Sequence, residues 1–147
     1  MARIEGFKSD VSKPVQLKWK RKLEKIDLMN DHEKLNYVEF PCADLGATRL
    51  FFETVFGWKF EDFGPEYMAF SNQGLDGGFF KSDLCARTET GSALLIFYSA
   101  DLESTLEKIQ AAGGSIVRET FAFPGGRRFH FSGPSGNEFG VWSDDSE

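Results

Sequence analysis

The stretch Asp44-Leu45-Gly46-Ala47-Thr48-Arg49-Leu50-Phe51-Phe52-Glu53-Thr54-Val55-Phe56-Gly57 decides the fold, because its frame occurs twice in the chain. Asp101-Leu102 is followed by Gly114 at the same spacing, 57 residues further on. Each copy follows a short apolar run, begins with an Asp suited to cap a helix and ends at glycine, which in the second copy is the pair Gly113-Gly114. The repeat predicts a duplicated module.

Short apolar runs and turn residues surround both predicted helices. A strand over 37–42 precedes the first helix, and a strand over 94–98 precedes the second, which spans 102–112. Three strands should follow each helix: 58–63, 67–71 and 78–81 in the first copy, and 115–121, 127–132 and 138–142 in the second. This order predicts an α+β fold of two βαβββ modules, at about 34–84 and 92–143.

Residues 1–33 form an arm that differs in charge from the rest. The first 34 residues carry nine Lys and Arg against six Asp and Glu, whereas the remainder carries eight against seventeen. Ser12, Pro14 and a stripe that includes Trp19 predict one amphipathic helix in the arm. We expect this helix to pack on the acidic body or on a second copy of the chain, which favours a homodimer. Nucleic acid is not expected as a partner, because phosphate binding needs clustered Lys and Arg.

Composition limits the class of protein further. With 147 residues, 41% of them hydrophobic, the chain can form one compact domain without disulfides. Cys42 and Cys85 lack a CxxC spacing, residues 1–10 contain no secretory apolar segment, and no run is long enough to span a membrane. These features predict a protein of the reducing cytoplasm with no membrane partner.

Three phrases, at 37–45, 51–58 and 133–142, resemble the vicinal oxygen chelate superfamily, which includes glyoxalase I, bleomycin-resistance proteins and extradiol dioxygenases. The turn Gly133-Pro134-Ser135-Gly136-Asn137 before the last strand is the most specific of these features. The resemblance covers about 35–143 and leaves the arm unexplained. It implies that 34–147 is a glyoxalase-like domain, in which two modules form a curled mixed-sheet cleft with helices on the outer faces.

The resemblance also implies a divalent metal ion, held in the cleft by His, Gln or Glu on the first and last strands of the modules. At these positions the chain has Tyr37, Leu94 and Gly140, and the segment 77–80 offers no such side chain. Because a metal ion needs several oxygen or nitrogen donors in fixed geometry, we expect no metal of the family type and no other cofactor.

An unconventional metal site stays open as an alternative. Strand alternation means that only an even shift of the alignment keeps a side chain in the cleft. A shift of two brings in Glu39 and Glu138, which could bind a divalent ion together with His130.

The segment 127–132 contributes polar side chains to the predicted cleft. Arg128, His130 and Ser132 alternate with Phe129 and Phe131, so that the two Phe should face the helices. The resulting ligand-binding candidates are Tyr37, Glu39, Leu94, Ile96, Tyr98, Arg128, His130, Glu138 and Trp142.

Structural roles compete with binding roles at several of these positions. His130 could be a strand residue with no task, and Tyr37 and Trp142 could belong to the core. Arg128 could form an ion pair with Glu39 or Glu138 instead of holding a ligand carboxylate.

Four functions fit the sequence. The first is a metal-free protein that binds a small planar or aromatic organic ligand. The second is a metal-free enzyme in which Glu39 or His130 acts as general acid or base and Arg128 stabilises an oxyanion. The third is a glyoxalase-like lyase, isomerase or dioxygenase with the unconventional metal site. The fourth is a ligand sensor that uses its arm for docking.

Overall fold

The computed structural model describes residues 30–144, so the predicted arm helix lies outside the described residues. The elements in chain order are β1 (Tyr37–Cys42), α3 (Leu45–Phe56), β2 (Phe60–Asp62), β3 (Tyr67–Gln73), β4 (Leu75–Lys81), the 3-10 helix η2 (Thr88–Thr90), β5 (Leu95–Tyr98), α4 (Leu102–Ala111), β6 (Ser115–Phe123), β7 (Gly126–Ser132) and β8 (Glu138–Ser143). This order confirms the predicted α+β fold with two βαβββ modules.

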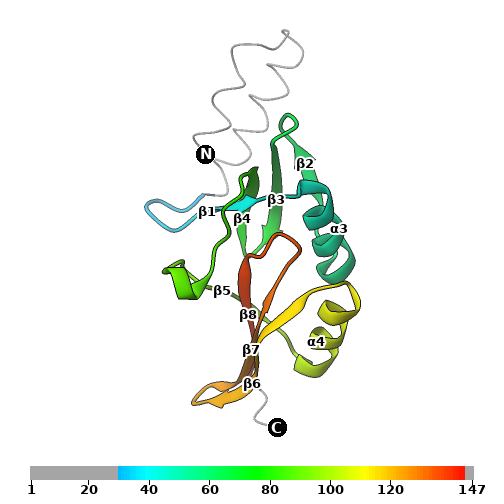
Figure 1. The fold of residues 1–147 in the computed structure, drawn as a ribbon. Coiled ribbons are helices and arrows are strands. Elements are labelled where there is room, and N and C mark those ends of the chain that lie inside the picture. Colours follow the sequence, from blue (N-terminus) through cyan, green and yellow to red (C-terminus); the bar gives the residue numbers. More distant parts are fainter. Residues whose placement is uncertain (1–29, 145–147) are drawn as a thin grey trace.

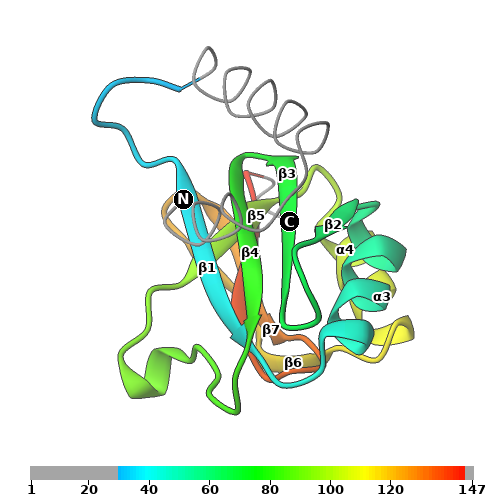
Figure 2. The same ribbon diagram turned by 90° about the horizontal axis from the view of Figure 1, so that it is seen from above.

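Each module forms its own four-stranded mixed sheet. The first sheet has the order β1-β4-β3-β2 and the second has the order β5-β8-β7-β6. In both sheets the strand before the helix pairs in parallel with the last strand, and the other pairs are antiparallel. The two helices lie together on one side of the sheets, and the connection that carries η2 lies on the other side (Figures 1 and 2). Both sheets are open rather than closed into barrels.

The helix ends follow the repeated frame, with one difference. Asp44 accepts a hydrogen bond from Ala47 N at 3.0 Å, and Asp101 accepts one from Ser104 N at 3.1 Å, so both are N-caps as predicted. Gly57 ends α3 in the left-handed conformation, with φ of 69°. After α4 the left-handed residue is Gly113, with φ of 93°. It comes one residue before Gly114, the position that matches Gly57 in the repeat.

The two modules share one aromatic core. The ring centroids of Phe40 on β1 and Phe139 on β8 are 5.1 Å apart. Phe56 on α3 stacks on Phe97 on β5 with a centroid distance of 4.4 Å. Because rings from both modules are in contact, the modules bury apolar surface together rather than separately.

The turn before β8 connects the two modules through hydrogen bonds. Asn137 is buried, and its side chain donates to Pro41 O on β1 and accepts from Ala86 N, both at 2.7 Å. Ser135 Oγ lies 2.9 Å from Thr48 Oγ1 on α3. The turn that carries the family resemblance therefore joins the second module to the first and to the connection between β4 and β5.

No helix within residues 30–144 has the length and apolar character needed to cross a membrane.

Candidate functional site

We call the sheet surfaces turned away from the shared core the open faces. Phe129 and Phe131 on β7 are fully buried toward the core, as predicted, so the residues that alternate with them point the other way. Strand register places the following residues on the open face of the first sheet: Tyr37, Glu39, Tyr67, Asp76, Gly78 and Phe80. The open face of the second sheet contains Ile96, Tyr98, Arg118, Phe121, Arg128, His130, Glu138, Gly140 and Trp142.

Equivalent strand positions carry different chemistry in the two modules. Glu39 pairs with Gly78 just as Ile96 pairs with Gly140, so both last strands have a glycine at the same place. In the next row, Tyr67 opposes Phe80, and Arg128 opposes Trp142. The duplicated backbone thus positions a tyrosine with a carboxylate in one module, and an arginine with apolar neighbours in the other.

A chain of hydrogen bonds connects the polar side chains on the first sheet. Tyr67 Oη donates to Glu39 Oε2 at 2.7 Å and lies 2.6 Å from Tyr37 Oη. A phenol has a single proton, and Tyr67 uses its proton in the bond to Glu39. Tyr37 must therefore be the donor in the bond between the two phenols. Burial raises the pKa of Tyr37, and burial also raises the pKa of Tyr67. Both phenols are therefore neutral donors at physiological pH, and the chain ends at the Glu39 carboxylate.

Gly78 makes this chain possible. Tyr67 reaches Glu39 by crossing β4, and a Cβ atom on Gly78 would lie 2.2 Å from Tyr67 Oη. Only a residue without a side chain leaves room for the phenol at this position.

A second polar chain lies on the second sheet. His130 Nδ1 is 3.0 Å from Glu138 Oε2, and Arg128 Nη2 is 2.7 Å from His130 Nε2. Since a guanidinium can only donate, Nε2 must accept, and the proton of a neutral His130 sits on Nδ1 facing Glu138. His130 and Glu138 are each 6% exposed. The histidine is thus held on both nitrogens by protein groups.

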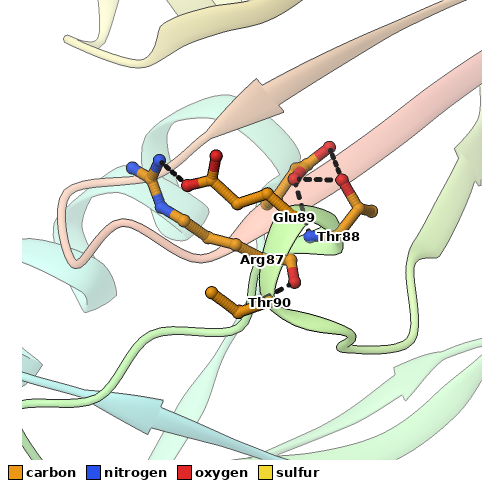
Figure 3. Close-up of polar contacts among 5 residues, drawn as sticks. Arg87, Thr88, Glu89 and Thr90 are labelled. Atoms are coloured by element: carbon orange, nitrogen blue, oxygen red, sulfur yellow. Dashed lines mark hydrogen bonds and ion pairs between the residues drawn. The ribbon is translucent and has the colours of Figure 1, made fainter.

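Thr88 of η2 completes the binding of Glu138. Its backbone N and its Oγ1 both donate to Glu138 Oε1, at 3.0 and 2.9 Å (Figure 3). Burial raises the pKa of Glu138, but the hydrogen bonds from Thr88 and His130 outweigh this effect and leave the pKa below its usual value. The ionised carboxylate therefore anchors the connection between β4 and β5 to the second sheet.

Apolar side chains surround this polar chain. Ile96 is 43% exposed and Tyr98 is 54% exposed, and the Tyr98 ring meets the Trp142 ring edge-on at 5.1 Å. Leu94 and Ile96 both lie over Gly140. Trp142 is only partly buried, so it is not a residue of the shared core. The second sheet thus presents an aromatic and aliphatic surface to solvent.

The donors present do not fit the metal that the resemblance implies. Gly140 offers no ligand atom, Leu94 covers it, and Tyr37 is engaged with Tyr67. Glu39 belongs to the hydrogen-bonded chain of the first sheet, whereas His130 and Glu138 bond each other on the second. Within residues 30–144, no group of three or more His, Cys, Asp and Glu side chains is placed to hold a metal ion.

Sequence reasoning missed four residues of these clusters: Tyr67, Thr88, Arg118 and Phe121. Tyr67 lies at the start of a strand whose partner could not be deduced, and Thr88 lies in a connection without a motif. The ion pair considered for Arg128, with Glu39 or Glu138, is not formed, because its guanidinium contacts His130 and the ring of Phe121. No local signal distinguishes Arg118 or Phe121 from ordinary strand residues.

Comparison with known proteins places the domain in a family. The model of the Glyoxalase/Bleomycin resistance protein/Dioxygenase superfamily matches residues 34–141. Comparison with curated protein sequences gave no match.

Solved structures with the same fold share little sequence with this chain. A glyoxalase-related enzyme from Fulvimarina pelagi has a TM-score of 0.61 at 21% identity, covering 76% of this chain and 88% of its own. The fosfomycin resistance protein FosX from Listeria monocytogenes has a TM-score of 0.64 at 18% identity, with 77% and 94% covered. Lactoylglutathione lyase from Agrobacterium tumefaciens has a TM-score of 0.58 at 16% identity, with 78% and 96% covered. The fold, the duplicated modules and the family match together show that this chain belongs to the Glyoxalase/Bleomycin resistance protein/Dioxygenase superfamily.

Proposed function

We propose that this protein binds a small, largely planar organic molecule on the open face of the second sheet, without a metal ion. The observation that carries the proposal is the exposure of Ile96 and Tyr98 beside Trp142, on the side of the sheets opposite to α3 and α4 (Figure 2). Exposed apolar side chains gathered around a few polar groups are typical of ligand sites. Two of the structural relatives, by their names, concern small molecules: fosfomycin and lactoylglutathione.

The absence of a metal ion from the proposal rests on the donor set. The positions that should supply ligands hold Tyr37, Leu94 and Gly140, and a carboxylate that could replace them, Glu138, is already bound by Thr88 and His130. Ligand binding should therefore be insensitive to EDTA, and elemental analysis of the purified protein should find no stoichiometric Zn, Ni, Mn or Fe.

The test uses N-phenyl-1-naphthylamine, a neutral fluorescent aromatic probe. We expect a saturable rise in its fluorescence with the wild-type protein, and an affinity about tenfold lower for Tyr98→Ala and for Trp142→Ala. Leu50→Ala is the matched control, because Leu50 is 65% exposed but lies on α3, away from the open face. Non-saturable binding, or equal losses in the Leu50 variant, would contradict the proposal. Circular dichroism of each variant checks that the fold is retained.

A metal-free enzyme is the second candidate, and the hydrogen-bonded chain on the first sheet favours it. Two neutral phenols end at the Glu39 carboxylate, which is a suitable arrangement for moving a proton. Both nitrogens of His130 are occupied, so Glu39 is the better general base. If turnover of any carbonyl compound is found, Glu39→Gln should abolish it. Unchanged turnover in that variant and in His130→Ala would eliminate this function.

A further inference from the structure

Two arginines within residues 35–144 lack a carboxylate partner among the described side chains. Residues 35–144 contain five arginines, and three of them form ion pairs: Arg49 with Asp62, Arg87 with Glu89 and Arg127 with Glu103. Within the described part of the chain, neither Arg118 nor Arg128 forms one. Acidic residues outnumber basic ones after residue 34, so the sequence provides enough carboxylates for every arginine. Leaving two guanidiniums unpaired at one place therefore needs an explanation.

Phe121 brings these two cations together. The Arg118 guanidinium carbon lies 3.7 Å from the centroid of the Phe121 ring, and that of Arg128 lies 5.4 Å from it. Arg128 is also 5.9 Å from the centroid of Phe123. Stacking on aromatic rings holds a guanidinium in place while leaving its N–H groups available for an anion. The two like charges repel each other, and a bound anion would relieve this repulsion.

Irregularities in β6 create this arrangement. Residues three apart on a regular strand, such as Arg118 and Phe121, point to opposite faces. The register between β6 and β7 shifts once between Ile116 and Arg118 and again before Phe121. As a result Arg118 opposes His130, Phe121 opposes Arg128, and all four side chains share the open face. Such bulges often redirect a side chain next to a functional site.

The donors of Arg128 are incompletely used by the protein. Its Nη2 donates to His130, and its Nε is buried without an acceptor among the described residues. Glu138 cannot serve, because it binds the far nitrogen of the His130 ring and Thr88. A buried donor without a partner is costly, so an acceptor supplied from outside would stabilise the site.

We infer that Arg118 and Arg128, stacked on Phe121, bind the anionic group of the ligand, so that the ligand class is a planar aromatic molecule bearing a carboxylate or a similar oxyanion. The inference rests on the proposed function. Trp142 opposes Arg128 in the strand register, and its ring centroid lies 6.2 Å from that of Phe123. The anion site therefore adjoins the aromatic surface proposed to hold the ring system.

Naphthalene-2-carboxylate and naphthalene-2-carboxamide test the inference, because they match in shape and differ in charge. In calorimetry with the full chain, the carboxylate should bind about tenfold or more tightly than the amide. Added salt should weaken binding of the carboxylate and leave binding of the amide unchanged. Arg118→Met, at an exposed position, should remove most of this preference, and Arg128→Lys should reduce it. Arg49→Met removes the same charge from α3, on the opposite side of the sheets, and should keep the preference.

The outcomes separate this inference from the proposed function. If both compounds bind the wild type equally, or if Arg118→Met keeps the preference, the arginine pair is not the anion site, and the aromatic surface alone remains. If neither compound binds, both proposals are overturned.

Discussion

At the residue scale, Gly78 shows how one missing side chain positions others. The space that its Cβ atom would need is filled by the phenol of Tyr67, which continues to Glu39 and Tyr37. The equivalent Gly140 is covered by Leu94 and Ile96 instead, with less crowding. The same backbone position therefore supports a polar chain in one module and an apolar surface in the other.

We expect Gly78→Ala to destabilise the protein by about 1–3 kcal/mol, because the new methyl group forces Tyr67 from its place in a packed site. Urea unfolding measures the change. Gly133→Ala is the control, since its nearest side-chain atom would be 3.9 Å away at Phe51, which is an ordinary contact, and it should change the free energy of unfolding by about 0.5 kcal/mol or less. If Gly78→Ala changes the free energy of unfolding as little as Gly133→Ala does, Tyr67 moves aside without cost, and this explanation of Gly78 is wrong.

At the scale of elements, the connection between β4 and β5 is held by the Glu138 carboxylate through Thr88, and by Asn137 through Ala86. The anchoring depends on charge, because an ionised carboxylate accepts several hydrogen bonds at once. The pKa of Glu138 is lowered from its usual 4.5. Its stabilising contribution is therefore complete above that value and is lost as the pH falls through the lowered pKa of the folded state.

Glu138→Gln should lower the free energy of unfolding by about 1–3 kcal/mol at pH 7, since a neutral amide binds Thr88 and His130 less well. The difference from the wild type should shrink as the pH is lowered below the usual carboxyl pKa, because protonated Glu138 resembles glutamine. Urea unfolding at a series of pH values checks both effects. Glu107→Gln, at an exposed position on α4, serves as the control. A difference that stays constant with pH would argue against an ionised anchor.

The sequence predicted most elements but not the irregular ones. The Asp caps and the alternation of Phe129 and Phe131 are local signals, and they gave both helices and the buried side of β7 correctly. Alternation fails in β6, where two register shifts put Arg118 and Phe121 on one face. The second helix was predicted over 102–112, one residue longer than the observed Leu102–Ala111, because helix ends are the least regular part of a sequence pattern.

The strand positions of the candidate site residues follow from the sequence, whereas their contacts do not. Strand periodicity brought the expected positions to the open faces, since periodicity follows from the sequence. The partners of Glu39, Tyr37 and Glu138 depend on strand register and on a connection without a motif, which pattern reading cannot supply. Tyr67 and Thr88 were missed for this reason.

At the scale of the whole molecule, the two modules depend on one core. Phe139 of the second module contacts Phe40 and Phe52 of the first, with ring centroids 5.1 and 5.5 Å apart. Neither sheet can bury its apolar side without rings from the other module. Unfolding should therefore be a single cooperative transition.

Phe139→Ala should lower the free energy of unfolding by about 3–5 kcal/mol through the cavity it leaves. Hydrogen exchange followed by mass spectrometry should show faster exchange in β1 and β4 as well as in β7, because both modules lose the contact. Val117→Ala, at a position 46% exposed on β6, should leave exchange nearly unchanged. Faster exchange confined to the second module would show that the modules are independent units.

The shared core also matters for redesign. The side chains proposed to contact a ligand lie on the open faces, whereas the rings that hold the fold lie on the opposite side of each sheet. New recognition properties could be introduced by exchanging Ile96, Tyr98, Arg118 or Trp142 without touching a core ring. In a duplicated domain built in this way, different side chains maintain the fold and contact the ligand. Substitutions on the open face of the second module, in nature or in the laboratory, can therefore change ligand preference with little loss of stability.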